Sequence, residues 1–255
     1  MVSERRTRST VLPQVLLAAV EEMLRQAPGP ARILDLGGGT GGLAVRLAAD
    51  GHDITVVDPS PDALAALARR ADEAGAGDRV RGVQGDAEGL GDVAAAGTVD
   101  LVLCHGVLEV VDDPQVALRE VHRVLTPAGR LSLLLTQRRG AVLARVGAGH
   151  LRQALRIATD PDGRWGAEDP LRRRFDPAQV LDLLRTTGFD VMATEGVRVF
   201  ADLVPRGRPD SGLDDEPVTR ELVAELEAWA ARDAGFRDVA GHLHVHARVA
   251  DETRP

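Results

Sequence analysis

Residues 33–42 read Ile-Leu-Asp-Leu-Gly-Gly-Gly-Thr-Gly-Gly, and this stretch decides the fold. An apolar pair, Ile33 and Leu34, leads into Asp35 and then into five glycines within six residues. Residues 43–49 are again mostly apolar, so the pattern predicts a buried strand, a tight glycine turn and a helix. Glycine lets a ligand approach the backbone closely, and a helix N-terminus presents unpaired N–H groups to anions. An ordinary turn needs fewer glycines, so we predict a site for a nucleotide-like cofactor.

The spacing within this turn narrows the choice of cofactor. The D-x-G-x-G-x-G signature of class I S-adenosylmethionine (SAM) methyltransferases resembles Asp35, Gly37, Gly39 and Gly41. The dinucleotide fingerprint G-x-G-x-x-G can also be placed here, ending at Gly42. The acidic residue before the glycines favours SAM, because SAM has an amino group to bind and no pyrophosphate.

The ends of three further predicted strands carry residues that suit the same cofactor. Asp58 ends the second strand, where a carboxylate can accept both ribose hydroxyls of SAM or of a dinucleotide. An acidic turn, in which methyltransferases read the adenine, follows the third strand at Asp86, Ala87 and Glu88. His105 ends the fourth strand, and ligands bind outside the carboxyl ends of such strands, so His105 is a candidate cofactor-binding or catalytic residue.

The composition limits the class of protein. A chain of 255 residues can bury a large core in one domain. The single cysteine, Cys104, excludes an internal disulfide framework, and no stretch approaches the ~18 apolar residues of a membrane span. We therefore expect a cytoplasmic protein without a membrane partner. A net charge of −8 argues against DNA and bulk nucleic acid as partners, although a local arginine cluster can serve a single RNA loop.

The order of apolar periods predicts an α/β fold with a doubly wound, Rossmann-like sheet of about seven strands. The predicted strands are 33–36, 52–58, 79–86, 99–104, 130–135, 189–200 and 243–249, and the main predicted helices are 9–26, 43–49, 61–75, 114–125, 177–184 and 218–231. The last strand is expected to be antiparallel and to lie at an edge. The chain is expected to form one domain, 1–255, with an N-terminal helical segment (1–29), a cofactor-binding core (30–136), an insertion (137–175) and the remainder of the sheet (176–250).

The insertion after the fifth strand is the only basic stretch of an acidic chain. It holds nine arginines and one tryptophan: Arg138, Arg139, Arg145, Arg152, Arg156, Arg164, Arg172, Arg173, Arg174 and Trp165. Its position suits a lid over the cofactor pocket, and a solvated helical insertion explains most of these arginines equally well.

Two patterns near the C-terminus bear on packing and on metals. The predicted helix 218–231 carries Leu222, Leu226 and Trp229 at helical spacing, with Val223 between them, so these side chains are expected to face inward. His242, His244 and His246 alternate in the last strand, so they share one face and resemble a metal cluster. No carboxylate or cysteine is obviously paired with them, so no metal is expected.

A closer resemblance extends beyond the cofactor core. Five segments are similar to the bacterial tRNA methyltransferase family that esterifies the carboxymethoxy group of wobble 5-carboxymethoxyuridine: 34–39, 105–110, 176–180, 196–200 and 244–248. This resemblance implies that SAM is contacted by Arg8, Gly37, Gly38, Asp58, Ala87, Glu88 and His105. It implies that Arg198 and His244 lie near the acceptor pocket. The chain departs from the family at Gly241-His242, where the family shows Arg-Tyr, and in the insertion, where arginines replace a lysine-rich part.

The expected reaction is methyl transfer to a carboxylate of the tRNA anticodon loop. A carboxylate is ionised at neutral pH, so it needs a cation to hold it but no general base. We expect Arg198 to be that cation, with His244 beside it, and Arg138 with Arg172–Arg174 to contact phosphates. A small-molecule O- or N-methyltransferase is the first alternative, in which His105 would be a general base. A non-catalytic SAM sensor and an NAD(P)-dependent oxidoreductase are the others, the latter disfavoured because the chain has no Tyr and no Lys.

Overall fold

A computed structural model describes residues 14–25, 29–203 and 216–251 of the chain, without the side chains of 216–220. One seven-stranded sheet has the order β3-β2-β1-β4-β5-β7-β6. Strands β1 to β5 run parallel to one another, and β7 runs antiparallel to both β5 and β6. The strands are β1 (Arg32–Leu36), β2 (Asp53–Asp58), β3 (Val80–Gln84), β4 (Val99–His105), β5 (Leu125–Thr136), β6 (Phe189–Val197) and β7 (His242–Val249). The predicted doubly wound α/β sheet is thereby confirmed.

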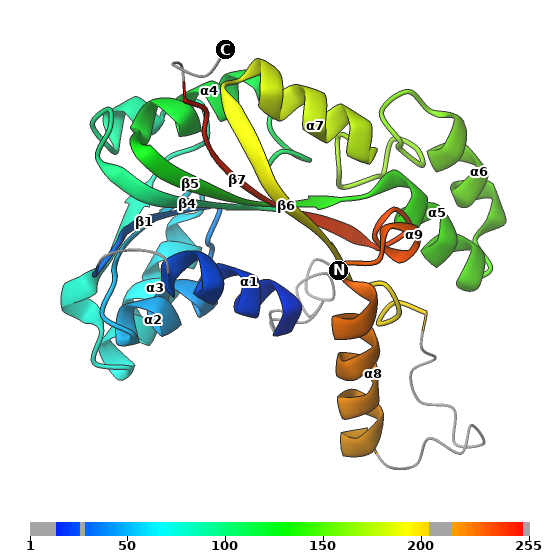
Figure 1. The fold of residues 1–255 in the computed structure, drawn as a ribbon, viewed down its shortest axis with the longest axis horizontal. Helices are drawn as coiled ribbons and strands as arrows, with labels where there is room; N and C mark the ends of the chain where they lie inside the picture. The colour runs from blue at the N-terminus through cyan, green and yellow to red at the C-terminus, as the bar shows by residue number, and fades with distance from the viewer. Residues whose placement is uncertain (1–13, 26–28, 204–215, 252–255) are drawn as a thin grey trace.

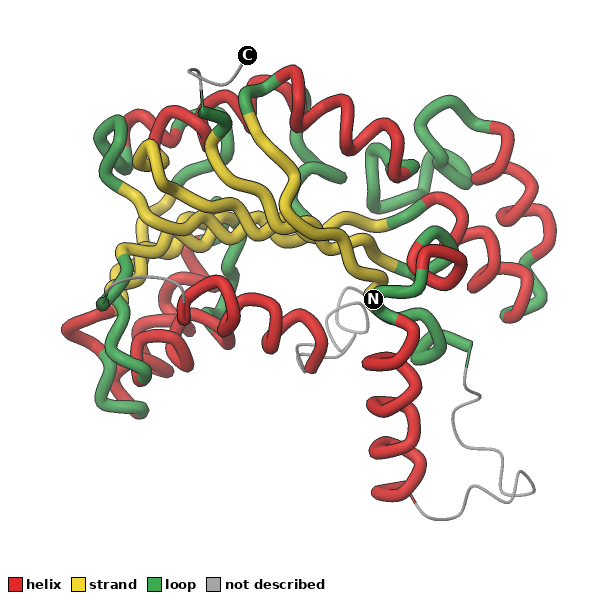
Figure 2. The backbone as a smooth tube through the Cα atoms, viewed as in Figure 1, coloured by secondary structure: helices red, strands yellow, loops and turns green. Residues whose placement is uncertain are grey.

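Helices cover both faces of the sheet, as Figures 1 and 2 show. The helices are α1 (Gln14–Arg25), α2 (Gly42–Ala49), α3 (Pro61–Glu73), α4 (Pro114–Val124), α5 (Arg138–Gly147), α6 (Leu151–Thr159), α7 (Pro177–Thr186), α8 (Glu216–Ala230) and α9 (Ala234–Arg237), with short 3-10 turns at η1 (Gly77–Arg79) and η2 (Leu90–Asp92). Helices α1, α2 and α3 lie on one face and α4 and α7 on the other, while α5 and α6 lie beyond the carboxyl end of β5 (Figure 1). No described helix is long and apolar enough to cross a membrane.

Two apolar clusters hold these layers together. One joins α1, α2 and α3 to residues such as Ile33 and Leu103, and the other joins α4 and α7 to Leu34 and Val102. Successive residues of β1 and β4 thus serve opposite faces, which is why these strands are apolar without alternation. The two apolar clusters hold the sheet in place, and loops form its carboxyl edge.

The helix starts follow their sequence signals. Ser60 accepts a hydrogen bond from the Ala63 amide, and Asp113 accepts from two amides at the start of α4. Asp176 and Gln179 form a reciprocal capping box at the start of α7. Each cap satisfies amides that have no partner inside the helix, so these boundaries were predictable from local sequence.

The C-terminal third corrects two expectations. Strand β7 does not lie at an edge, because it pairs with β5 on one side and with β6 on the other. The prediction that one face of α8 points inward is wrong, since the side chains on that face, Leu222, Leu226 and Trp229, are 54%, 48% and 64% exposed. Among the α8 side chains that the structure describes, Glu227 and Ala230 are the buried ones, so the contact of this part of α8 with the body is partly polar. Figure 1 shows why: most of α8 projects away from the sheet.

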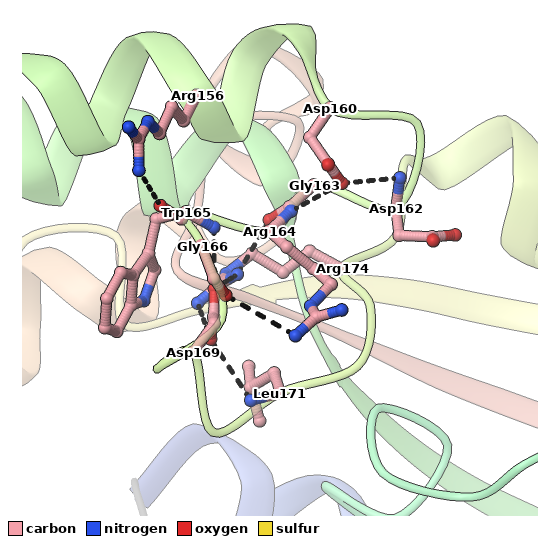
Figure 3. A network of polar contacts seen from close by, with 10 residues as sticks. All are labelled: Arg156, Asp160, Asp162, Gly163, Arg164, Trp165, Gly166, Asp169, Leu171 and Arg174. Atoms are coloured by element: carbon pink, nitrogen blue, oxygen red, sulfur yellow. Dashed lines mark hydrogen bonds and ion pairs between the residues drawn. The ribbon is translucent and has the colours of Figure 1, made fainter.

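Polar contacts between its own residues hold the arginine-rich insertion together (Figure 3). Arg174 and Asp169 form a two-pronged ion pair, with N–O distances of 2.7 and 3.2 Å and side chains only 6% and 0% exposed. Burial alone would raise the pKa of Asp169, but hydrogen bonds from Arg174 and from the Trp165 and Leu171 amides hold it below its ordinary value. These contacts organise the turn after α6.

Both ends of the insertion are fastened to the carboxyl edge of the sheet. Gln137 and Phe175 form a parallel bridge where the insertion leaves and returns. The Arg173 guanidinium donates to three carbonyls of the loop after β4, at Leu108, Val111 and Asp112, over 2.6 to 3.0 Å. Arg173 thus connects the insertion to the loop that follows His105.

Candidate functional site

The glycine turn lies at the carboxyl end of β1 and brings two of the predicted cofactor residues together. Asp58 ends β2 and accepts a hydrogen bond of 3.0 Å from the Gly39 amide. Gly41, the residue before α2, has a φ of 71°, and a Cβ there would lie 2.0 Å from Leu67 Cδ1. A Cβ on Gly38 would lie 2.3 Å from Asp35 Oδ2. Glycine is required because the turn is folded tightly against both the carboxylate and α3.

Asp35 is a buried carboxylate without a hydrogen-bond donor among the described residues, at 5% exposure. Burial, together with the nearby charge of Asp58, raises the pKa of Asp35 to about 7. An ionised carboxylate in such surroundings is stabilised by a cationic ligand. The turn therefore fits a ligand that brings a positive group, as the amino group of SAM does.

The loop after β3 adds the other predicted cofactor residues. Asp86 accepts hydrogen bonds of 3.0 Å from the amides of Glu88 and Gly89, so its carboxylate shapes the turn. Ala87 is buried and Glu88 is exposed. Strand β3 is one of the neighbours of β2, so this turn lies at the same edge as Asp58. Arg8, also predicted to contact SAM, lies outside the described residues.

A polar chain crosses the sheet from β4 to β6 on the face that carries α1. His105 Nε2 is 2.9 Å from Ser132 Oγ, which is 2.9 Å from His244 Nε2. His244 Nδ1 is 3.7 Å from Glu195 Oε2, and Arg232 Nε is 3.0 Å from Glu195 Oε1. The chain connects His105, at the cofactor edge, to the outermost strand.

The proton positions along this chain follow from its carboxylate end. A carboxylate can only accept, so Glu195 favours a proton on Nδ1 of His244. In the His244 tautomer with its single proton on Nδ1, the bare Nε2 accepts from the Ser132 hydroxyl, and Ser132 in turn accepts from Nε2–H of His105. This assignment leaves Nδ1 of His105 as a hydrogen-bond acceptor.

His105 is thereby kept neutral at physiological pH. Burial, and to a lesser extent the charge of His244, lowers the pKa of His105 to about 3. An efficient general base has a pKa near the working pH, so this environment disfavours His105 as a proton acceptor in catalysis. A neutral ring does suit contact with the positively charged sulfonium of SAM, since a protonated ring would repel it.

Arg198 lies at the same carboxyl edge, directly after β6. It is the non-glycine residue with a positive φ, 60°, among those the structure describes. Its guanidinium pairs with Asp202, while its Nε–H is buried and has no hydrogen-bond partner in the described chain. Burial and the charge of Arg198 lower the pKa of His242 to about 4. A partly exposed arginine at this edge, beside a neutral histidine, is suited to hold an anion.

The structure corrects the expected neighbour of Arg198. The register pairs Val197 with His242, so His242 is the histidine that faces this arginine. His244 is only 1% exposed and lies inside the polar chain, where it cannot touch an acceptor directly.

The structure also reassigns three of the predicted phosphate contacts. Arg138 donates to the carbonyls of Asp160 and Pro161 and lies 3.3 Å from an Asp176 oxygen, so it supports the insertion. Arg173 and Arg174 are engaged internally as described above. Their guanidinium groups are used by the fold, and only Arg172 of this group is exposed.

Sequence reasoning missed several polar residues of this edge. Ser132 interrupts the apolar run of β5, and a lone serine in a buried strand was a usable signal. Glu195 gave no such signal, because its partners are on other elements, and the alternation of His242, His244 and His246 suggested a metal cluster and not a neighbour of Arg198. Cys104 is buried, and burial raises the pKa of its thiol, so it is not a nucleophile here. No group of three or more metal-binding side chains occurs among the described residues.

Comparison with known proteins agrees with this geometry. The methyltransferase domain family matches residues 34–133. The tRNA 5-carboxymethoxyuridine methyltransferase of Escherichia coli (strain K12) is 31% identical over 243 residues, covering 94% of this chain and 87% of that protein. A ubiquinone biosynthesis O-methyltransferase of Xanthomonas axonopodis pv. citri (strain 306) is 31% identical over 179 residues, 68% of each protein.

Solved structures share the fold at low identity. The geranyl diphosphate C-methyltransferase of Streptomyces coelicolor A3(2), solved with S-adenosyl-L-homocysteine, has a TM-score of 0.61 and 17% identity, covering 93% of this chain and 76% of that one. A SAM-dependent methyltransferase of Methanosarcina mazei has a TM-score of 0.62 and 16% identity, covering 91% and 98%.

Fold, glycine turn and family match together define a class I SAM-dependent methyltransferase, and its cofactor is SAM. SAM supplies an activated methyl group, and the residues of this chain provide alignment and electrostatics. Within that class, the chain belongs to the family of the Escherichia coli tRNA 5-carboxymethoxyuridine methyltransferase.

Proposed function

We propose that this methyltransferase transfers its methyl group to the carboxylate of 5-carboxymethoxyuridine at the wobble position of tRNA. The relative that bears this name is similar over nearly the whole chain, including the segments outside the cofactor core. The product is a methyl ester, formed when a carboxylate oxygen attacks the methyl carbon in line with the S–CH₃ bond, which breaks to release S-adenosylhomocysteine. No proton has to be removed, which agrees with the absence of a suitably tuned base at His105.

The observation that carries the proposal is the position of Arg198 at the carboxyl edge of the sheet, with its side chain 25% exposed. One side of its guanidinium is held by Asp202. A carboxylate that reaches the exposed part of the guanidinium gains a charge-assisted hydrogen bond, while Asp202 keeps the arginine in place. Partial neutralisation by Asp202 also leaves the acceptor oxygen electron-rich enough to attack.

Contacts to the RNA backbone are assigned to the outer face of the insertion. Arg139, Arg152, Arg156 and Arg172 are exposed there. Sequence-specific RNA recognition targets single-stranded loops with splayed bases, so a small cationic surface suffices in an acidic protein. We therefore expect these arginines, in place of Arg138, Arg173 and Arg174, to contact phosphates of the anticodon loop.

A small-molecule O- or N-methyltransferase is the second candidate. It is favoured by the acidic net charge and by the similarity to a ubiquinone biosynthesis O-methyltransferase over 68% of the chain. A phenol or amine acceptor requires a base, and His105 with a pKa of about 3 is a weak one. This second function is therefore less consistent with the electrostatics of the site.

The deciding experiment incubates the purified enzyme with labelled SAM and tRNA that carries 5-carboxymethoxyuridine. We expect a label that base hydrolysis releases, as from an ester, and no labelling of unmodified tRNA. Arg198→Ala is expected to reduce kcat/KM for this tRNA by roughly 2–3 kcal/mol of transition-state stabilisation, the scale of a lost charge-assisted contact, with SAM affinity unchanged.

The matched control is Arg185→Ala, since Arg185 also pairs with a nearby aspartate on a helix, Asp182, but at an exposed position of α7. It is expected to leave transfer unaffected. Equal labelling of unmodified tRNA, or a label that resists base, would exclude the wobble carboxylate and favour a small-molecule acceptor.

A further inference from the structure

A single buried carboxylate from α8 holds the turn that carries Arg198. Glu227 is 8% exposed, and its Oε2 accepts a hydrogen bond of 2.9 Å from the Val199 amide. Its Oε1 accepts from the amides of Phe200 and Ala201, each at 2.9 Å. Three consecutive backbone donors thus converge on one side chain that is 26 to 28 residues away in the sequence.

This convergence accounts for the unusual backbone of Arg198. Successive backbone amides that point toward one place form a concave anion site, and here Glu227 fills the site formed after Arg198. A positive φ is unfavourable for a side chain as large as arginine and persists only where the surroundings impose it. Three hydrogen bonds to a carboxylate are strong enough to impose it, because each is charge-assisted.

Packing around the turn fixes its position relative to the sheet. The Gly241 amide, just before β7, donates to the Arg198 carbonyl over 3.1 Å. Val199 is buried against Ala230 of α8 and against Ala240. The Ala231 carbonyl, at the end of α8, accepts from the Gly196 amide of β6. The end of α8 and the start of the turn are therefore one unit, whereas most of α8 projects outward (Figure 1).

We propose that Glu227 is a positioning residue for acceptor binding, which aims the Arg198 guanidinium by clamping the amides of residues 199–201. The inference rests on the proposed function, in which Arg198 holds the acceptor carboxylate. Glu227 itself is enclosed by backbone donors and does not touch the acceptor. Its effect on transfer must therefore pass through Arg198, and this requirement makes the role testable.

The test compares Glu227→Gln with Glu225→Gln, a substitution two residues away at an exposed position of the same helix. A glutamine amide retains one acceptor oxygen, but its NH₂ group opposes the amide donors. Glu227→Gln is expected to lower kcat/KM for the modified tRNA about 10- to 100-fold, the loss associated with charged hydrogen bonds, with SAM affinity within about twofold of the parent. Glu225→Gln is expected to change neither quantity. If Glu227→Gln does not fold, Glu227→Asp replaces it in the test, because aspartate keeps the negative charge on a shorter side chain.

A double-mutant cycle separates positioning from general stabilisation. In an Arg198→Ala background, Glu227→Gln is expected to cause no further loss of transfer, because the group that it aims is already absent. The same fold-loss in both backgrounds, or no loss in the parent, would overturn the proposal.

Hydrogen exchange distinguishes failure of this inference from failure of the proposed function. Amides 199–201 are expected to exchange faster in Glu227→Gln than in Glu225→Gln, whatever the acceptor is. Unchanged exchange would show that Glu227 does not clamp the turn. If Arg198→Ala alone transfers like the parent while exchange accelerates, the assignment of Arg198 to the acceptor is wrong and the clamp itself stands.

Discussion

Two parts of the carboxyl edge of the sheet are built in different ways: the part around the glycine turn (the cofactor edge) and the part around Arg198 that we propose to bind the acceptor (the acceptor edge). At the cofactor edge, the five glycines of residues 37–42, together with Asp35 and Asp58, place backbone amides and carboxylates around one turn. At the acceptor edge, Arg198 depends on Asp202, on Glu227 from α8 and on the Gly241 amide before β7. The first edge is encoded within one short stretch, and the second is assembled from elements far apart in the sequence.

This difference indicates how the binding of the cofactor and the binding of the acceptor are separated in the molecule. A cofactor common to many enzymes is bound by a local motif, whose geometry follows from glycine backbone freedom. An acceptor is bound by side chains whose aim depends on tertiary contacts, and such contacts can change without disturbing the motif. Substitutions at the acceptor edge should therefore affect transfer but not SAM affinity, and those at the cofactor edge should affect SAM affinity first.

The largest effect is expected from breaking the buried ion pair of the insertion. Arg174→Ala leaves Asp169 charged and buried, which typically costs about 3–5 kcal/mol. Because the insertion lies beyond the end of β5, we expect transfer to tRNA to fall while SAM binding persists. Denaturant unfolding and calorimetric SAM titration measure the two quantities.

Arg185→Ala is the matched control, since Arg185 pairs with Asp182 at the surface, with the two side chains 75% and 68% exposed. Exposed pairs contribute about 0–1 kcal/mol. Equal destabilisation by the two variants would mean that the insertion does not depend on its buried pair.

A smaller effect is expected at the glycine turn. Gly41→Ala combines a positive φ with a Cβ placed 2.0 Å from Leu67 Cδ1, so we expect a loss of about 2–4 kcal/mol and a marked loss of SAM affinity. Gly51→Ala also places an alanine at a positive φ, 97°, but the added Cβ lies in open space.

The difference between these two variants isolates the close approach of the turn to α3. We expect about 1 kcal/mol for Gly51→Ala, from backbone strain alone. If Gly41→Ala bound SAM normally, the tight turn would not be what shapes the cofactor site.

The smallest effect is expected from pH. The pKa of Asp35, about 7 in the folded protein against 3.8 ordinarily, means that its ionised form is lost below pH 7. If this carboxylate binds the SAM amino group, affinity should fall up to about tenfold, or 1.4 kcal/mol, for each pH unit below 7 and level off above it. Calorimetry between pH 5.5 and 8.5 measures this dependence.

The linked effect on stability has the opposite sign. The folded state binds this proton more tightly than the unfolded state, so the protein without cofactor should lose stability as pH rises from about 4 to 7. Asp35→Asn is expected to flatten both curves and to weaken SAM binding. A pH-independent affinity in the parent would exclude contact between Asp35 and the amino group.

Several features could be predicted from the sequence because their causes are local. The order of strands and helices, the caps at Ser60, Asp113 and Asp176, and the glycine turn depend on residues within a few positions of one another. The antiparallel last strand followed from the family resemblance and was confirmed, but its interior position was not predicted. Pairing with β6 places β7 inside the sheet, and that pairing is long-range.

The incorrect predictions have a common physical origin. The apolar spacing of α8 suggested that Leu222, Leu226 and Trp229 face inward, whereas the helix buries Glu227 instead. Periodicity identifies an apolar face but cannot say whether the fold supplies a surface to cover it. The expected pairing of Arg198 with His244 failed for a related reason, because the register between β6 and β7 selects His242.

The sequence by itself determined the class of this protein, because a strand and a glycine turn indicate a nucleotide-like cofactor through backbone geometry and the carboxylate of Asp35 before the glycines favours SAM. The sequence also contains the residues of the acceptor edge, but it does not show how they are arranged. Only the tertiary structure decided that His105, Ser132, His244 and Glu195 form one chain, and that Glu227 holds the turn of Arg198. Hydrogen bonds and charges act over a few ångströms, so partners that are 27 to 112 residues apart meet only when the sheet and α8 are in place.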